Sequence, residues 1–137
     1  MKLHVIARGR IGQSPEADLV QRYAVRLKGR LAITEIADTA PWPAFGGGRT
    51  VVLDERGKDL PSAELAALLG RWRDDGAREV RFLIGAADGH DAPTRAQADL
   101  LLGFGRATWP HMLVRAMLAE QLYRAIAILD GHPYHRA

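Results

Sequence analysis

Two short and almost continuously apolar runs constrain the fold of this chain most strongly. They lie at residues 49–54 and 80–84, and the first is rich in β-branched residues. A strand that is apolar on both sides is expected where a sheet is covered on both faces, as parallel sheets are. Helical patterns separate these and other strands, and this alternation predicts an α/β domain with a mostly parallel sheet flanked by helices.

Apolar periodicity and turn residues predict the remaining elements. Alternation favours strands at residues 3–7 and 31–36, and a further short strand is expected near residues 106–108. Helices are predicted from apolar residues at helical spacing, with capping residues at their starts and glycine at their ends. They comprise a helix capped by Ser14 and closed by Gly29, a helix capped by Ser62 that ends near Gly76, a short helix that begins at residues 91–93, and a final helix from about Pro110 to Leu129.

Two segments are predicted to be irregular. Residues 37–48 contain Trp42 between two prolines and end in three consecutive glycines, a composition typical of a loop. This loop is not expected to carry a secondary element of its own. Gly57 is expected to supply a turn after the strand at residues 49–54.

Length and composition exclude several classes of protein. A chain of 137 residues fits a single domain. It has no cysteine, which excludes disulfides, thiolate metal sites and cysteine nucleophiles. No run approaches the roughly 18 apolar residues that a membrane span needs, and charge interrupts residues 1–8 too soon for a signal peptide. A cytoplasmic protein is therefore expected.

Charge is concentrated near the N-terminus. The net charge is only +3, but residues 1–31 hold seven basic side chains against two acidic ones. A basic segment is compatible with a nucleic-acid partner, and equally with a solvated helix face. Charge alone does not decide between the two interpretations.

The most informative residues follow the ends of predicted strands. Leu53-Asp54, Ile84-Gly85 and Thr108-Trp109 all fall at such ends, and ligands of α/β proteins usually bind there. Glycine lets a ligand approach the backbone closely. Each glycine taken alone is favoured about two to one as a simple turn residue, but three strand ends that converge on one region raise the odds of a small-molecule site to about even.

Other candidate motifs are weaker. Gly103-x-Gly105 lacks the third glycine of a dinucleotide-binding loop. His132 and His135 have no third ligand nearby, so no metal site is predicted. The tail at residues 132–136 combines rings with an arginine and suits an RNA base and its phosphate, although it could equally be a functionless terminus.

Two features of the last helix bear on function. Glu120 and Arg124 have the i, i+4 spacing of a local ion pair. Arg115 is expected near the second glycine-bearing loop, where it could meet a ligand or a phosphate. No Ser/His/Asp arrangement, carboxylate pair or phosphate-binding loop is recognised, so hydrolysis and phosphoryl transfer lack support.

The motifs in the second half of the chain resemble a known family in their order and spacing. Together they are similar to the bacterial large-subunit (23S) ribosomal RNA pseudouridine N3-methyltransferases, small enzymes of the SPOUT class. Met1-Lys2-Leu3 and Arg22-Tyr23 extend the resemblance over nearly the whole chain. The motifs are Leu83-Ile84-Gly85, Thr108-Trp109-Pro110-His111, Val114-Arg115, Glu120-Gln121-Leu122-Tyr123-Arg124-Ala125 and His132-Pro133-Tyr134-His135-Arg136.

The resemblance implies a specific fold and activity. The fold would be a SPOUT-type α/β domain over residues 1–137, with a C-terminal trefoil knot that pattern reasoning cannot predict because knots are so rare. The enzyme would be a homodimer that uses S-adenosylmethionine, bound in a bent conformation, to methylate N3 of a pseudouridine in the assembled ribosome. It would need no metal and no membrane.

The resemblance also implies which residues form the site. Arg115, Arg124, Tyr134 and His135 would face the methyl group and the RNA, with His135 as the candidate base and an arginine to stabilise negative charge. Residues that share a cofactor-binding role would be Leu53, Gly85, Phe104, Gly105, Arg106, Ala107, Thr108 and Trp109.

Two departures from the family pattern keep other interpretations open. Ala86 follows Gly85 where relatives usually have a second glycine, and its methyl group could crowd the cofactor. The loop at residues 37–48 is short where relatives usually carry a basic helix, so the N-terminal arginines could replace its RNA contacts. The alternatives are a non-catalytic RNA- or ribosome-binding protein with the same fold and, less favoured, a dinucleotide-dependent oxidoreductase.

Apolar residues outside the main stripe of the last helix give the expected homodimer a physical basis. Leu113, Ile126 and Ile128 add more apolar surface to this helix than a small monomer easily covers.

Overall fold

All five strands pair in parallel within one sheet. The computed structural model describes residues 1–134 and orders the strands β2-β1-β4-β3-β5. The predicted mostly parallel α/β sheet is therefore confirmed, although the last strand is not where the sequence pattern put it. The strands are β1 (Lys2–Arg8), β2 (Leu31–Ile36), β3 (Arg49–Asp59), β4 (Glu79–Ile84) and β5 (Leu100–Gly103).

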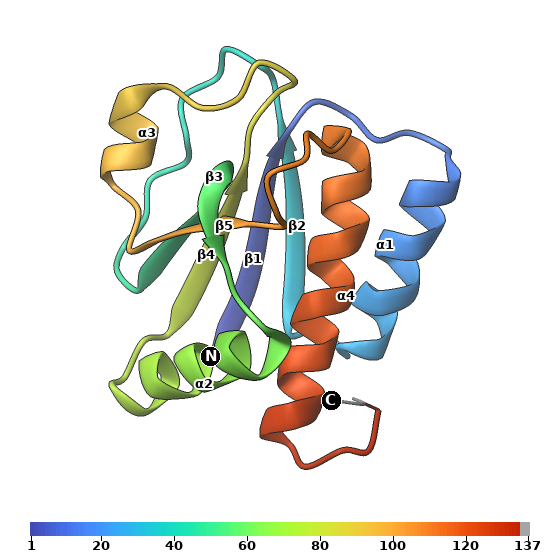
Figure 1. Cartoon of the computed structure of the whole chain (residues 1–137), viewed down its shortest axis with the longest axis vertical. Coiled ribbons are helices and arrows are strands. Elements are labelled where there is room, and N and C mark those ends of the chain that lie inside the picture. The colour runs from blue at the N-terminus through green and yellow to red at the C-terminus, as the bar shows by residue number, and fades with distance from the viewer. Residues whose placement is uncertain (135–137) are drawn as a thin grey trace.

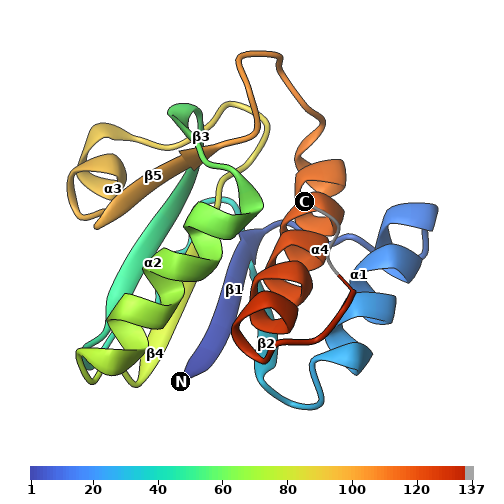
Figure 2. The ribbon, with the colours of Figure 1, turned by 60° about the horizontal axis from the view of Figure 1, so that its bottom comes forward.

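Three of the four helices cover one face of the sheet. They are α1 (Pro15–Arg26), α2 (Ser62–Asp74) and α4 (His111–Leu129), whereas the short α3 (Ala92–Ala96) lies apart from them beside β5 (Figure 1, Figure 2). In both views α1 and α4 run side by side. None of the helices described is both long enough and apolar enough to cross a lipid bilayer.

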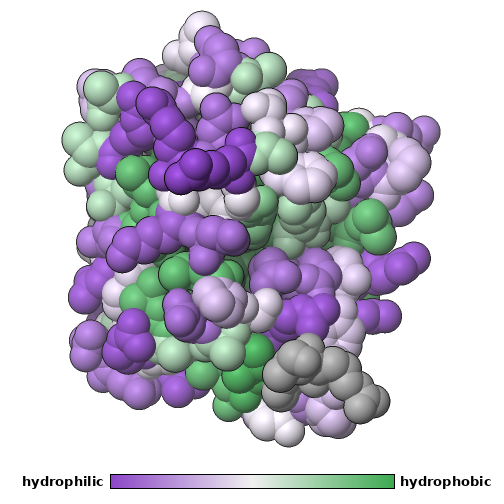
Figure 3. Space-filling view, in the orientation of Figure 1, coloured by the Kyte–Doolittle hydropathy of each residue, from purple (hydrophilic) through white to green (hydrophobic). Residues whose placement is uncertain are grey.

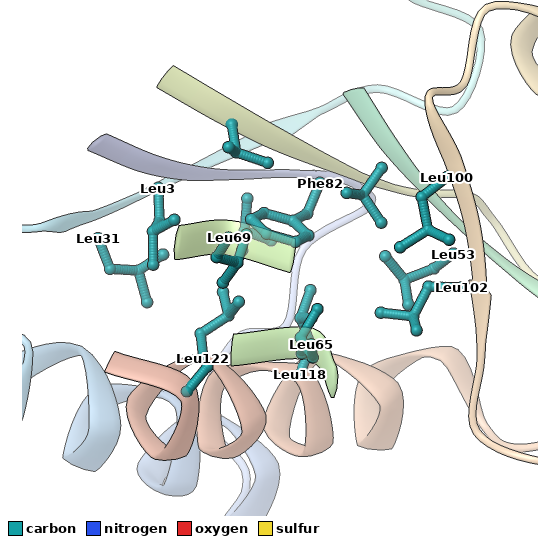
Figure 4. Packing of buried hydrophobic residues seen from close by; sticks show 14 of the residues in the cluster. Leu3, Leu31, Leu53, Leu65, Leu69, Phe82, Leu100, Leu102, Leu118 and Leu122 are labelled. Atoms are coloured by element: carbon teal, nitrogen blue, oxygen red, sulfur yellow. The ribbon is translucent and has the colours of Figure 1, made fainter. Parts of the chain in front are cut away.

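The main core lies between this helical layer and the sheet. Phe82 of β4, Leu69 of α2, and Leu118 and Leu122 of α4 are all completely buried there (Figure 4). Complete burial of such a side chain contributes about 1.5–3 kcal/mol. The outer surface over these helices is largely hydrophilic, with apolar areas between charged side chains (Figure 3).

A loop covers much of the opposite face of the sheet. Ile6, Val52 and Leu83 form a second, smaller cluster there, and Trp42 from the loop at residues 37–48 packs against it. The loop has no helix or strand of its own, as predicted. Buried Arg81 reaches into this region and donates to the carbonyl oxygen of Pro43 at 3.1 Å. The packing of Trp42 and the hydrogen bond from Arg81 therefore hold the loop against this face of the sheet.

The predicted turn at Gly57 is wrong, because β3 continues through this residue to Asp59. The register of β3 against β5 shifts within this segment instead, so that both Leu53 and Lys58 pair with Leu102. The two backbones come so close that a Cβ atom on Gly57 would lie 2.6 Å from the carbonyl carbon of Leu101. Glycine at this position therefore allows two strands to approach each other closely. It does not reverse the chain.

The short strand predicted at residues 106–108 is also wrong. The strand is β5 at Leu100–Gly103, and Gly105 (φ +92°) turns the chain into a loop before Thr108. A three-leucine run is too short for periodicity to distinguish strand from helix, which explains why the pattern missed it.

Of the two predicted serine caps, the one at Ser14 is confirmed and the one at Ser62 is wrong. Ser14 caps α1, since its Oγ accepts the N–H of Ala17 at 3.0 Å. Ser62 does not cap α2, because Pro61 takes the cap position and Ser62 becomes the first helical residue. Its hydroxyl instead donates to Oε1 of Gln121 at 2.6 Å and so ties α2 to α4.

Gly57→Ala should destabilise the protein by about 1–3 kcal/mol, because the added methyl group collides with the β5 backbone. Gly46→Ala is the matched control, since nothing lies within 4 Å of a Cβ atom there, and its effect should stay within about 0.5 kcal/mol. Urea unfolding followed by circular dichroism measures both. Equal stability of the two variants would contradict the close approach of β3 and β5.

Candidate functional site

The irregular part of β3 and the loops that follow β4 and β5 line a cavity of about 490 Å³. Leu53-Asp54, Ile84-Gly85 and Thr108-Trp109 all line it, so the predicted convergence of these three pairs is confirmed. Only Ile84-Gly85 lies at the end of its strand, because β3 continues past Leu53-Asp54 to Asp59 and Thr108 lies five residues beyond the end of β5. Parallel strands bring their carboxyl ends to one edge of a sheet, and this edge is where ligands of such folds bind.

The loop after β4 is narrow and depends on glycine. A Cβ atom on Gly85 would lie 3.1 Å from both the carbonyl oxygen of Gly89 and Cε1 of His90. Gly89 has a φ of +85° and donates its N–H to the carbonyl oxygen of Ala86 at 2.9 Å, which closes the turn. Ala86 itself lines the cavity.

Hydrogen bonds fix the loop after β5. Trp109 is 42% exposed, and its Nε1 donates to the carbonyl oxygen of Phe104 at 3.0 Å. The hydroxyl of Thr108 donates to Glu55 at 3.0 Å and so joins this loop to the irregular part of β3. Phe104, Gly105, Ala107, Thr108 and Trp109 all line the cavity, whereas Arg106 is exposed and does not.

A buried carboxylate lies in the cavity wall. The side chain of Asp54 is 8% exposed and accepts the N–H of Arg56 at 2.8 Å. Arg95 approaches the other carboxylate oxygen at 3.8 Å and donates to the carbonyl oxygen of His90 at 3.0 Å. Two arginines therefore lie close enough to balance the negative charge of Asp54.

His90 is a cavity residue that sequence reasoning did not single out. Burial lowers the pKa of its imidazole, and the backbone near Leu83 and the charge of Asp54 oppose this effect only in part. Its ring packs against Trp42 at 5.8 Å, and its Nε2 is buried with no hydrogen-bond partner within residues 1–134. The only sign of this role in the sequence was the position of His90, directly after Gly89 in the loop that follows β4.

Arg115 does not line the cavity, although its helix begins there. It is 3% exposed, and its guanidinium donates to Glu35 of β2 and to the carbonyl oxygens of Arg8 and Gly9, the latter two at 2.9 and 2.7 Å. The expected contact between Arg115 and a ligand is therefore replaced by contacts to the chain itself.

Arg124 and Tyr134 lie together at the far end of α4. Arg124 pairs with Glu120, as the i, i+4 spacing predicted, and this hydrogen bond raises the pKa of Arg124. The hydroxyl of Tyr134 donates to the same carboxylate at 3.2 Å. Burial, neighbouring Tyr23 and the charge of Glu120 raise the pKa of Tyr134 to about 12. His135 and Arg136 lie outside the described residues.

The whole chain matches one protein family, described as "Predicted SPOUT methyltransferase", whose model aligns with residues 1–135. The chain belongs to the SPOUT methyltransferase family. The resemblance inferred from its motifs is thereby confirmed.

Several curated relatives of this SPOUT methyltransferase carry the name ribosomal RNA large subunit methyltransferase H. The chain is 66% identical to that of Novosphingobium aromaticivorans, over 99% of both chains. It is 61% identical to that of Erythrobacter litoralis, over 100% of this chain and 99% of the relative. Identity to that of Zymomonas mobilis is 59%, again over 99% of both chains. The SPOUT methyltransferase and these relatives thus correspond along their full lengths.

Within residues 1–134 of the SPOUT methyltransferase, no three histidine or acidic side chains are grouped so that they could hold a metal ion. Polar side chains of both charges line the cavity, among them Asp54, Glu55, Asp88, His90, Arg95, Thr108 and His111. Such a lining suits an organic ligand that is held by hydrogen bonds.

His90→Gln should change how the stability of this SPOUT methyltransferase depends on pH. The folded-state pKa of His90 is lowered, so the unfolded chain binds more protons as the pH falls below about 6.5. The wild type should therefore lose stability on acidification more steeply than His90→Gln. Urea unfolding of both proteins between pH 7.5 and 5 measures this, and parallel curves would contradict a buried, neutral His90.

Proposed function

We propose that this chain transfers a methyl group from S-adenosylmethionine to N3 of a pseudouridine in large-subunit (23S) ribosomal RNA, with the assembled ribosome as substrate. One observation carries the proposal. The irregular part of β3 and the loops that follow β4 and β5 line a cavity of about 490 Å³ in a chain that is 66% identical to a ribosomal RNA large subunit methyltransferase. The size and the position at the carboxyl edge of the sheet are those of a small-molecule site.

The lining of the cavity fits S-adenosylmethionine, which when bound supplies an electrophilic methyl group. Leu53, Gly85 and the run Phe104–Trp109 would hold it. Gly85 lines the cavity, and a larger residue there would crowd the loop that forms the cavity wall. Arg106 lies outside the lining, so its contribution would come through the loop backbone.

The chain's own residues would align the pseudouridine and accept its N3 proton. The N3 of pseudouridine carries a proton at neutral pH, and loss of that proton makes the nitrogen a better nucleophile. His135 is the proposed base. Tyr134 stays protonated at neutral pH, because its pKa is about 12, and so would act as a hydrogen-bond donor. Arg124 stays charged and would stabilise negative charge on the pseudouridine ring.

The separation of these groups supports the proposal of a homodimer. His111 lines the cavity at the start of α4, whereas Arg124 lies thirteen residues further along the helix. At 1.5 Å per residue these positions are about 20 Å apart. Arg124, and Tyr134 beside it, therefore lie far from the cavity of their own protomer, and we propose that they complete the cavity of the partner subunit. Leu113, Ile126 and Ile128 are only partly buried in the protomer and are candidates for the interface.

The remaining features of the proposal rest on family membership. Residues 1–137 would form a single SPOUT domain whose C-terminal part is tied in a trefoil knot. The enzyme would act in the cytoplasm and would need no metal.

The alternative is a non-catalytic protein that keeps the fold and binds ribosomes. Ala86 favours it, because this residue lines the cavity and adds a methyl group where relatives usually have glycine. Such a protein would bind ribosomes without methylating them.

The deciding experiment incubates the protein with radiolabelled S-adenosylmethionine and ribosomes that lack the modification, and then locates label in the RNA. Label on a pseudouridine of the large-subunit RNA is the expected result. Absence of label together with tight ribosome binding would establish the non-catalytic alternative.

Gly85→Val should weaken S-adenosylmethionine binding roughly tenfold or more, because the branched side chain fills the space beside His90 and Gly89. Isothermal titration calorimetry measures the affinity. Gly46→Val, in open surroundings outside the cavity, is the control and should bind like the wild type. Unchanged affinity in Gly85→Val would place the cofactor elsewhere.

Mixed dimers test the shared site. Gly85→Val disables the cavity and Arg124→Ala disables the tail, so each variant alone should be inactive. After subunit exchange, half of the dimers are mixed and each has one intact site, which predicts recovery of about a quarter of wild-type activity. Activity that stays at the level of the separate variants would mean that each site is built from one subunit.

A further inference from the structure

Arg115 joins three parts of the chain near the carboxyl edge of the sheet. It projects from the first turns of α4, pairs with Glu35 of β2, and donates to the carbonyl oxygens of Arg8 and Gly9 where β1 ends. Its Nε is buried and makes no hydrogen bond within residues 1–134. The guanidinium therefore has no solvent-accessible edge to offer to a substrate.

Glu35 extends this connection into the loop that follows β1. Its carboxylate accepts the N–H of Ile11 at 2.8 Å in addition to the hydrogen bond from Arg115. Burial raises the pKa of Glu35, but these two hydrogen bonds and the charges of Arg115 and Arg10 outweigh it, so the pKa is lowered overall. Glu35 thus stays ionised at neutral pH and holds both partners.

The segment that this pair fixes has little structure of its own. Residues 9–13 include Gly9 (φ +88°) and Gly12 (φ +62°) and contain no helix or strand. Between the two glycines, Arg10 is exposed and makes no hydrogen bond or ion pair within the described chain. Two left-handed glycines in four residues allow many conformations, so the contacts of Arg115 and Glu35 select one of them.

This segment lies beside the start of α4, next to the cavity. A Cβ atom on Gly9 would be 3.8 Å from the terminal methyl group of Met112, and the neighbouring His111 lines the cavity. Figure 1 shows the segment after β1 crossing near the N-terminal end of α4. Arg10 is thus an exposed cation with no direct hydrogen bond to the described chain, at the edge of the sheet where the proposed reaction would occur.

We propose that Arg10 binds a phosphate of the ribosomal RNA substrate, and that Arg115 and Glu35 form a positioning pair that holds the Arg10 segment in place. The inference rests on the proposed function, because it takes RNA as the substrate. It revises the role of Arg115 from a stabiliser of charge at the reacting base to a residue that acts through the segment after β1. Phosphate contacts of this kind position a protein on nucleic acid and provide much of its salt-dependent affinity.

Arg10→Ala tests the phosphate contact by equilibrium binding to ribosomes at several salt concentrations. Affinity should fall several-fold, and the slope of log affinity against log salt should decrease by about 1. Arg71→Ala is the matched control, since Arg71 is equally exposed but lies on α2. S-adenosylmethionine affinity should not change. An unchanged salt slope in Arg10→Ala would overturn the phosphate contact.

Arg115→Lys, Glu35→Gln and the double variant test the positioning pair. Both single variants should weaken ribosome binding and raise KM, with kcat and cofactor affinity nearly unchanged. The double variant should be no worse than the weaker-binding single variant, because the two side chains act as one unit. Circular dichroism and urea unfolding verify that the variants fold.

The opposite pattern would overturn the positioning role. If Arg115 stabilised charge at the reacting base, Arg115→Lys would lower kcat while Glu35→Gln left it unchanged. Methylation by the wild type, measured in parallel, separates this failure from failure of the proposed function. A wild type that binds ribosomes without methylating them would refute the proposed reaction, and the salt slope of Arg10→Ala would still decide the phosphate contact.

Discussion

The packing of α4 against the sheet, α1 and α2 is the interaction on which the other features depend. Leu118 and Leu122 are completely buried at this junction, and small residues such as Ala119 and Ala125 let the neighbouring elements approach closely. The same helix begins at the cavity and ends beside Tyr134. It therefore fixes the distance between the cofactor loops and the tail, and that distance is the physical reason to expect a second subunit.

The cavity depends on a second constraint, the absence of side chains where strands and loops come close together. Gly57 and Gly103 allow β3 and β5 to pair on both sides of the irregular segment that carries Asp54. Gly85 leaves room for the imidazole of His90. The result is a site lined by both charged and apolar residues, which suits a reaction in which the protein contributes alignment and electrostatic support more than covalent chemistry.

Much of this architecture could be predicted from the sequence, for identifiable reasons. The parallel sheet was predicted from runs with consecutive apolar residues, such as residues 49–54. The convergence of these segments on one site was predicted from the glycines near the strand ends. The close approach at Gly57 could not be predicted, because a glycine that serves a strand contact looks the same as one that serves a turn. The partners of Arg115 were equally hidden, since Glu35 lies eighty residues away and no local pattern links them. His90 was missed because a lone histidine carries no periodic signal.

The most direct test of the central claim is a crystal structure of the protein with S-adenosylhomocysteine. Ligand density is expected between the irregular part of β3 and the loops that follow β4 and β5, with Arg124 and Tyr134 of a second subunit facing the same cavity. Ligand bound elsewhere, or a cavity that no second subunit approaches, would contradict it.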